Sequence, residues 1–228
     1  MKSLMRSSLR HLQNHWHERH HRALEAKYRS FTMIPSETYV KNLALADKMR
    51  SISGCVVECG TWRGGMIAGI ADVLGADRQY FLFDSFEGLP PARDVDGPSA
   101  KAWQANTTSS GYHNNCTASE EDARGAMEMS AASSFLTIKG WFDKTLPDFK
   151  PPSEIALLRL DADWYESTRV CLANLYPYVA TGGIIIFDDY GTWDGCARAV
   201  HEFLSRESKT ATTPRLDRFR DDVYYIVR

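Results

Sequence analysis

The sequence lacks a hydrophobic run long enough to cross a membrane. Its apolar runs, such as residues 184–187, are the length of a strand, whereas a spanning helix needs ~20 apolar residues. No apolar segment follows the basic residues near the N-terminus, so we expect no secretory signal, and an organellar transit peptide stays open for the acid-free residues 1–17. Five cysteines without a Cys-x-x-Cys pair favour neither a disulfide framework nor a zinc knuckle, and they fit a reducing, cytoplasmic location.

A strong net charge is also absent, because 27 basic and 29 acidic side chains give the 228 residues a net charge of −2. The charges are unevenly distributed: residues 1–30 have a net charge of +5 and residues 31–228 a net charge of −7. The acidic main part argues against a nucleic acid as the partner. The length and a hydrophobic fraction of 43% predict either one large globular domain or one domain with an appendage, and they exclude collagen-like, coiled-coil and disordered chains.

The appendage is a basic N-terminal arm, which we place at residues 1–50. Apolar residues recur every three or four positions over residues 9–31, and this spacing predicts an amphipathic helix. A second helical stretch follows over residues 38–49. Between the apolar positions of the first stretch lie histidines that fit either a metal-binding tract or a solvated helix face, and their spread over several faces favours the second: His15, His17, His20 and His21.

Residues 51–228 form the main domain, in which short apolar strands alternate with helical periods. This alternation predicts an α/β fold with a parallel sheet covered on both faces. The expected strands lie at residues 55–58, 80–84, 135–138, 155–160, 183–187 and 222–227, and the expected helices at 65–74, 119–129, 164–178 and 193–205. Residues 85–117 have little periodicity and predict a loop that covers the substrate, with a disordered insertion as the alternative. Ligands of such sheets bind at the carboxyl ends of the strands.

A glycine-rich turn follows the first expected strand. Gly60, Gly64 and Gly65 let the backbone approach a ligand, but their spacing is not the Gly-x-Gly-x-x-Gly of dinucleotide-binding proteins. Glu58 before the turn would repel a pyrophosphate and suits a positively charged ligand, such as the amino-acid end of S-adenosylmethionine. Asp84 ends the second strand, where an acid can accept both ribose hydroxyls. Together these residues indicate an adenosyl ligand.

Four carboxylates end the fourth and fifth expected strands. Asp161 and Asp163 follow the fourth strand, and Asp188 and Asp189 follow the fifth. Carboxylates packed together repel one another, so these four acids predict a bound cation that compensates their charge. Ligands that are all oxygen select Mg²⁺, Ca²⁺ or Mn²⁺ over zinc. The alternative is that these acids cap the next helices, above all Asp163.

Five motifs in this order closely resemble the macrocin O-methyltransferase family: residues 58–65, 83–90, 140–147, 160–168 and 187–191. Members of the family methylate sugar hydroxyls on macrolide and aminocoumarin antibiotics. The resemblance implies a Rossmann-like class I methyltransferase fold, with a mostly parallel seven-stranded sheet, that uses S-adenosylmethionine and Mg²⁺. It makes residues 51–228 the methyltransferase domain and residues 1–50 an arm for lid or oligomer contacts.

The resemblance also implies roles for single residues. Asp161, Asp188 and Asp189 would be the metal ligands, and Asp163 would be the general base. Residues of the cofactor site would be Glu58, Gly60, Thr61, Asp84, Ser85, Trp141 and Phe142.

We therefore predict an O-methyltransferase that uses S-adenosylmethionine and Mg²⁺ and acts on a hydroxyl of a glycoside or polyhydroxylated natural product. Two adjacent hydroxyls could chelate the metal, which favours a vicinal diol. Two alternatives stay open, a methyltransferase for catechols or phenols and a non-catalytic adenosyl-binding protein. A nucleic-acid methyltransferase lacks its Asp/Asn-Pro-Pro-Tyr segment here, and a short-chain dehydrogenase lacks its Tyr-x-x-x-Lys pair. We expect a homodimer or higher homo-oligomer, without nucleic-acid or membrane partners.

Overall fold

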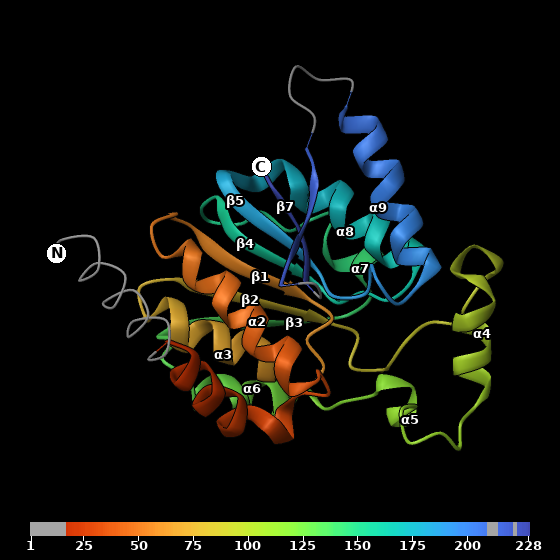
Figure 1. The fold of residues 1–228 in the computed structure, drawn as a ribbon, viewed down its shortest axis with the longest axis horizontal. Coiled ribbons are helices and arrows are strands. Elements are labelled where there is room, and N and C mark those ends of the chain that lie inside the picture. Colours follow the sequence, from red (N-terminus) through yellow and green to blue (C-terminus); the bar gives the residue numbers. More distant parts are fainter. Residues whose placement is uncertain (1–16, 209–213, 221–222) are drawn as a thin grey trace, which may run out of the picture.

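The computed structural model describes residues 17–208, 214–220 and 223–228, and it contains a seven-stranded sheet between two layers of helices (Figure 1). The strands run in the order β3-β2-β1-β4-β5-β7-β6. The first five are parallel, and β7 is antiparallel to both β5 and β6. Their bounds are β1 Cys55–Cys59, β2 Gln79–Asp84, β3 Ser134–Lys139, β4 Ile155–Leu160, β5 Val179–Phe187, β6 Leu216–Phe219 and β7 Val223–Val227.

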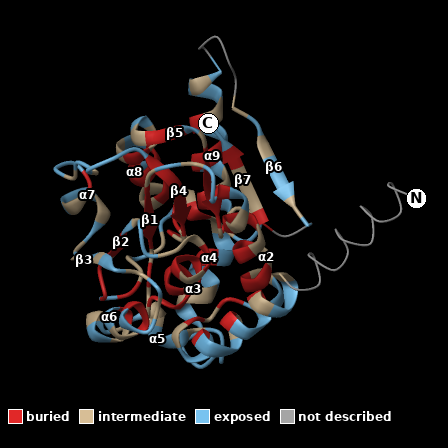
Figure 2. Cartoon of the chain, turned by 90° about the vertical axis from the view of Figure 1, so that its left-hand side faces the viewer, coloured by how far each residue is buried: buried red, intermediate tan, exposed pale blue. Residues whose placement is uncertain are grey.

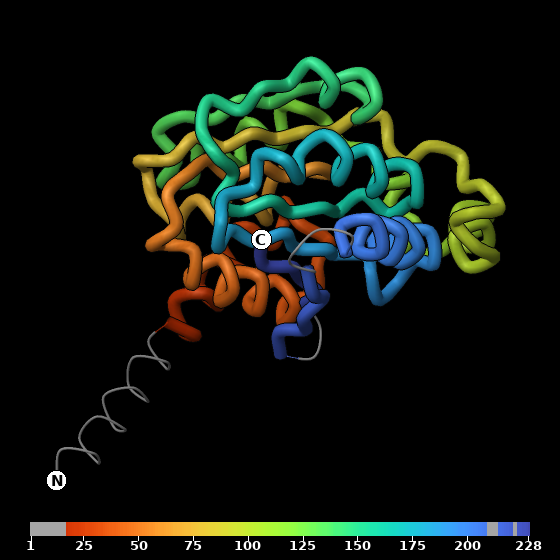
Figure 3. Tube along the Cα trace, turned by 90° about the horizontal axis from the view of Figure 1, so that it is seen from above, coloured from red at the N-terminus to blue at the C-terminus, as the bar shows by residue number. Residues whose placement is uncertain are grey.

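One helical layer, which we call the N-terminal layer, is formed by helices within residues 17–128. The first helix (residues 17–28) and the short helices η1 (Arg29–Phe31) and η2 (Asp47–Met49) join the longer helices of this layer, which are α2 (Ser36–Ala46), α3 (Gly65–Leu74) and α6 (Glu120–Glu128). The opposite layer contains α7 (Phe142–Thr145), α8 (Tyr165–Leu175), η4 (Tyr176–Tyr178) and α9 (Asp194–Glu207). Figure 3 shows the two layers from above, on either side of the sheet.

Alternating residues of the central strands fill two cores, one on each face of the sheet. In β1, Val56 packs with the N-terminal layer, whereas Val57 packs with α8 and α9. This alternation follows from the period of two in a strand. All five residues of β1 and all six of β4 are buried, and Figure 2 shows the buried residues concentrated in the sheet and on the inner faces of the helices.

The N-terminal layer is continuous with the core of the sheet. Leu24 and Tyr28 of the first helix and Leu43 of α2 are buried in the same cluster as Val56 and Ile67. The division at residue 50 stays a prediction, and these contacts make the two sides of it one packed body. Residues 9–16 of the expected amphipathic helix, with His15, lie outside the described residues.

The segment of residues 85–117 contains helices rather than one irregular loop. It holds η3 (Asp94–Asp96), α4 (Gly97–Ala105) and α5 (His113–Cys116). Gly97 and Pro98 begin α4, and a proline in the first turn is compatible with a helix because no intrahelical donor is lost there. Figures 1 and 3 both show α4 extending away from the main body.

The predicted fold class is confirmed. The expected strand at residues 155–160 coincides with β4, and the other expected strands agree with observed ones to within a few residues. Strand β6 was not expected, because it has four residues and two of them are charged. Within the described residues, no helix combines the length and the apolar character needed to cross a membrane.

Candidate active site

A cavity of about 640 Å³ opens at the carboxyl ends of the parallel strands. The strand order reverses between β1 and β4, because β2 and β3 continue the sheet on one side and β5 on the other. Such a switch point separates the connecting loops and leaves a crevice. The N-terminal layer also reaches this cavity, since Met33, Ile34 and Pro35 line it together with residues from the strand ends.

The turn after β1 requires glycine at its first position. Gly60 has a φ of 86°, in the left-handed region, and a Cβ atom built on it would lie only 1.6 Å from the carbonyl oxygen of Asp161. The turn after β1 therefore packs directly against the end of β4. This close approach places the glycine turn and the first of the four predicted acids on one wall of the cavity.

Asp84 lies at the end of β2 and lines the same cavity. Its carboxylate accepts hydrogen bonds from the backbone N–H groups of Trp62 and Phe86, each at 2.7 Å. Burial raises the pKa of Asp84, and these backbone donors act in the opposite direction. The two donors fix the orientation of the side chain toward the turn after β1.

Five of the seven predicted cofactor residues line the cavity: Gly60, Asp84, Ser85, Trp141 and Phe142. The Ser85 hydroxyl also stabilises its own turn, because it donates to the carbonyl of Gly88 at 3.0 Å. Thr61 is buried, and its hydroxyl donates to the carbonyl of Phe83 at 3.4 Å. Thr61 and Glu58 are not among the described residues that line the cavity, so their part in cofactor binding stays a prediction.

Three carboxylates gather on the cavity wall, and we call Asp161, Asp163 and Asp189 the acid cluster. Their oxygen atoms lie within 4.8 Å of one another. Asp163 has a φ of 51°, in the left-handed region, and its backbone N–H donates to Oδ2 of Asp189 at 2.9 Å. Nε1 of Trp193 donates to Oδ1 of Asp163 at 3.0 Å.

The acid cluster is electrostatically unfavourable without a cation. Burial, with repulsion from Asp188, raises the pKa of Asp161 to about 7, although Arg159 opposes this shift. Burial and the neighbouring carboxylates also raise the pKa of Asp163 and of Asp189 well above the ordinary value. Three convergent carboxylates whose charges are poorly compensated match the oxygen ligands that Mg²⁺ prefers, so the residues present fit this ion.

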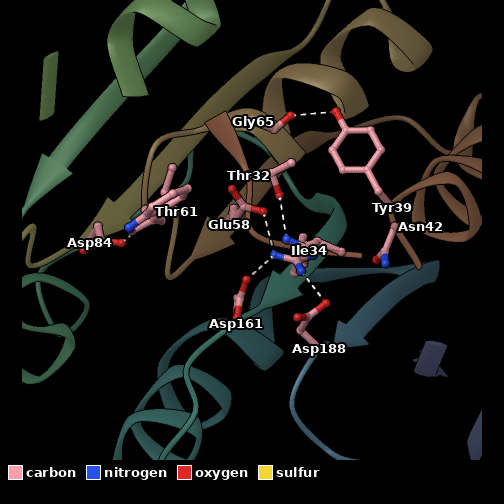
Figure 4. Close-up of polar contacts among 12 residues, drawn as sticks. Thr32, Ile34, Tyr39, Asn42, Glu58, Thr61, Gly65, Asp84, Asp161 and Asp188 are labelled. Atoms are coloured by element: carbon pink, nitrogen blue, oxygen red, sulfur yellow. Dashed lines mark hydrogen bonds and ion pairs between the residues drawn. The ribbon is translucent and has the colours of Figure 1, made fainter. Parts of the chain in front are cut away.

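The fourth predicted acid, Asp188, lines the cavity but is paired with a buried arginine of β4. Nη2 of Arg159 donates to Asp188, and Nη1 donates to Oε1 of Glu58 and to Oδ2 of Asp161, each at 2.9 Å. Figure 4 shows the side chains of Glu58, Asp161 and Asp188 pointing toward one another, with these contacts drawn as dashed lines. Within the described residues, Oε2 of Glu58 is buried and has no hydrogen-bond partner.

Arg159 is the main site-forming residue that the sequence reasoning missed. It is completely buried. The signal was a single basic residue in the otherwise apolar stretch of residues 155–160, shortly before Asp161 and Asp163. An arginine within a fully buried strand must have acidic partners, because an unpaired buried charge is strongly unfavourable.

An aromatic cluster borders the acid cluster. The ring centroids of Trp164 and Trp193 are 5.2 Å apart. The ring centroid of Trp103 in α4 lies 6.3 Å from that of Trp164 and 6.0 Å from that of Trp193. Tyr112 lies 5.3 Å from Trp103. Nε1 of Trp164 donates to the carbonyl of Pro90 at 2.9 Å. These rings connect the projecting segment to the loops that carry Asp163 and Asp189.

The strand order, with an antiparallel β7, and the cavity at the switch point define a Rossmann-like class I methyltransferase fold. Comparison with known families identifies the group within this class. The chain belongs to the macrocin O-methyltransferase family (TylF), whose profile matches residues 4–225. The match includes most of the basic arm.

Several characterised proteins are similar to this chain. Demethyldecarbamoylnovobiocin O-methyltransferase of Streptomyces niveus is 35% identical over 183 residues, which cover 77% of this chain and 66% of that protein. Mycinamicin III 3''-O-methyltransferase of Micromonospora griseorubida is 32% identical over 174 residues, which cover 73% and 66%, respectively. The chain thus spans just under two thirds of the length of these relatives. The solved structure of the O-methyltransferase NovP has a TM-score of 0.70 at 30% identity, and the match covers 87% of this chain and 82% of that one.

Proposed function

We propose that this protein is an S-adenosylmethionine- and Mg²⁺-dependent O-methyltransferase that acts on a hydroxyl of a vicinal diol in a sugar or natural-product acceptor. The observation that carries the proposal is the position of the acid cluster in the same cavity as the glycine turn and Asp84. A methyl donor and a hydroxyl acceptor must meet in line at ~3–3.5 Å, and one cavity with both kinds of site allows this.

For the cofactor, the proposal assigns the ribose hydroxyls to Asp84 and the adenine to the region of Trp141 and Phe142. Asp84 is already held in place by two backbone donors, so little conformational freedom would be lost on binding. Gly60 keeps the backbone of the turn close to the cavity. Glu58 at the end of β1 does not line the cavity, and it would attract the positively charged part of the cofactor electrostatically.

For the acceptor, the proposal keeps Asp161, Asp188 and Asp189 as the groups that would hold Mg²⁺. When bound, the ion would lower the pKa of an acceptor hydroxyl and fix its position. Asp163 would take the proton of that hydroxyl, and its raised pKa suits a general base. The two relatives named above act on natural products, which supports an acceptor of this class.

The test of this function is methyl transfer from labelled S-adenosylmethionine to three groups of acceptors: glycosides, sugar nucleotides and catechols. We expect transfer to a glycoside or sugar nucleotide with adjacent hydroxyls, lost in EDTA and restored by Mg²⁺. Transfer to catechols alone would replace the sugar class by the phenolic one. Full activity in EDTA would overturn the role of the metal, and failure to bind S-adenosylhomocysteine would overturn the function itself.

The cytoplasmic location and a homo-oligomeric state stay predictions.

Replacing Trp193 by Phe is expected to change the pH dependence of turnover. The variant keeps an aromatic ring near Trp103 and Trp164 but removes the N–H that donates to Asp163. This donor stabilises the ionised carboxylate, so its loss raises the pKa of Asp163 further. The base must be ionised to act, so the rising limb of the pH–kcat profile should move to higher pH by about one pH unit.

The control for this variant is W164F, because Trp164 belongs to the same aromatic cluster but donates to the carbonyl of Pro90 instead. We expect W164F to leave the position of the limb unchanged, even if it lowers kcat. Equal shifts in both variants would show that aromatic packing, and not the hydrogen bond to Asp163, sets the profile.

A further inference from the structure

A second group of metal-ligating side chains lies between the first helix and the end of α2. His17, His21 and Asp47, which we call the His–Asp cluster, bring their ligand atoms within 4.8 Å of one another. None of the three is among the described residues that line the active-site cavity. The cluster is therefore separate from the site of methyl transfer.

The arrangement follows from two local features. His17 and His21 are four residues apart on one helix, a spacing that places both rings on the same face. Asp47 is the first residue of η2, directly after α2, and its Oδ2 lies 2.9 Å from Nδ1 of His17. The other oxygen of Asp47 accepts a hydrogen bond from Arg50, which fixes the orientation of the carboxylate.

The sequence favoured a solvated helix face for these histidines, and this interpretation is wrong for His21, which is 3% exposed. The reason is tertiary, because η2 brings Asp47 next to these histidines, and helical periodicity alone does not predict that contact. The side chain of His17 is 40% exposed, so solvent reaches one side of the cluster. His21 is thus a buried ligand, Asp47 is a carboxylate of fixed orientation, and His17 is a ligand that solvent can reach. Together they have the features of a partly open metal site.

We propose that His17, His21 and Asp47 bind a zinc-type divalent cation that fastens the first helix to the end of α2. Two imidazole nitrogens with one carboxylate oxygen suit Zn²⁺, Co²⁺ or Ni²⁺, whereas Mg²⁺ prefers ligands that are all oxygen. Three protein ligands leave a fourth tetrahedral position for water, on the exposed side of His17.

The charge state of the cluster is compatible with this ion. Burial lowers the pKa of His21 to about 4, although Asp47 acts in the opposite direction. At neutral pH the imidazole is therefore neutral, which is the form that binds a metal. Arg50 contacts Oδ1 of Asp47, whereas His17 faces Oδ2. Asp47 can therefore bind a cation through Oδ2 while Oδ1 keeps its hydrogen bond to Arg50.

The position of the cluster gives it a structural role. The C-terminal half of the first helix is already anchored, because Leu24 and Tyr28 are buried and the Tyr28 hydroxyl donates to Asp72 at 2.9 Å. Residues 17–21 contain no apolar side chain, and His21 is the buried residue among them. A cation on the His–Asp cluster would fasten this half as well. After the first helix the chain continues to Met33 and Ile34, which line the active-site cavity.

The test is titration of the full-length chain, free of any polyhistidine tag, with Co²⁺ and Zn²⁺ in the presence of excess Mg²⁺. We expect one Co²⁺ per chain with the visible absorption of a tetrahedral site containing nitrogen ligands. Zn²⁺ at 100 times its Kd should raise Tm by roughly 5–10 °C. The variants H17A and D47N should each weaken binding by about 100-fold or more. Both residues are more accessible than His21, so these variants test the site even if H21A does not fold.

The matched control is H20A, because His20 is a neighbour of His21 in the first helix but lies outside the His–Asp cluster. We expect H20A to change the Kd by less than about threefold. If H17A and H20A have equal effects, or if neither changes the Kd, the cation binds elsewhere and the proposal is wrong. Absence of Zn²⁺ binding by the wild-type chain would also overturn it. None of these outcomes depends on methyltransferase activity.

Discussion

Replacing Asp189 by Asn is expected to lower turnover by about 10³-fold, because a metal ion that positions and acidifies a hydroxyl contributes several kcal/mol to the transition state. Asp189 is only 7% exposed and belongs to the acid cluster. Asn has nearly the same shape and keeps an oxygen that can accept the N–H of Asp163. The variant should therefore fold and bind S-adenosylhomocysteine normally, while the Mg²⁺ concentration needed for half-maximal rate rises.

The control for this variant is D148N, since Asp148 is an exposed acid outside the cavity lining. We expect its turnover to stay within twofold of the wild-type value. Turnover of D189N above about a tenth of the wild-type rate would contradict the proposed role of Asp189.

A second pair of variants separates two possible sets of metal ligands. By the family resemblance, D188N should weaken Mg²⁺ binding, and D163N should lose rate with Mg²⁺ still bound. The geometry also allows Asp163 as a ligand, because it lies in the acid cluster while Asp188 is paired with Arg159. Calorimetric Mg²⁺ titration decides between them: if D163N loses Mg²⁺ affinity and D188N keeps it, Asp163 is the third ligand.

Replacing Arg159 by Met is expected to lower the free energy of unfolding by about 3–5 kcal/mol at pH 8, the loss typical for removal of one partner of a buried ion pair. Glu58, Asp161 and Asp188 would then be left without their common counter-charge. Burial raises the pKa of Glu58 to about 8 even with Arg159 present. Urea unfolding of the metal-free variant measures the loss.

The loss should be smaller at pH 5 than at pH 8. Without the guanidinium, the folded state keeps protons on these carboxyl groups, whereas the unfolded state releases them near pH 4. The folded state then binds more protons, so the free energy of unfolding of R159M falls as the pH rises through this interval. The control R169Q removes only an exposed pair with Glu166 and should cost less than about 1 kcal/mol at either pH. A similarly small loss in R159M at pH 8 would contradict the role of Arg159.

The central strands of the sheet could be predicted from the sequence because they are buried on both faces. Residues 155–160 are apolar except for Arg159 and are followed by acids, and they form β4 without a shift of either boundary. The acids after β4 and β5 were expected to meet because carboxyl ends of parallel strands share one edge, and three of them do so within 4.8 Å.

The remaining features depend on contacts that are distant in sequence. Arg159 brings together Glu58 and Asp188, which are 101 and 29 residues away from it, and no local pattern contains that information. The partner of His17 and His21 is Asp47, which follows a separate helix. Helix α4 was missed for a different reason, because Gly97 and Pro98 at its start are typical of turns as well as of helix N-termini.

Tryptophan rings packed edge to face give the molecule an optical signal beside the candidate active site. Three of the six tryptophans, Trp103, Trp164 and Trp193, lie within one cluster. The indole N–H of Trp193 contacts Asp163 directly, and that of Trp164 contacts the loop at Pro90. Fluorescence of these indoles therefore reports the charge of Asp163 and the position of α4 relative to the cavity, without an added label.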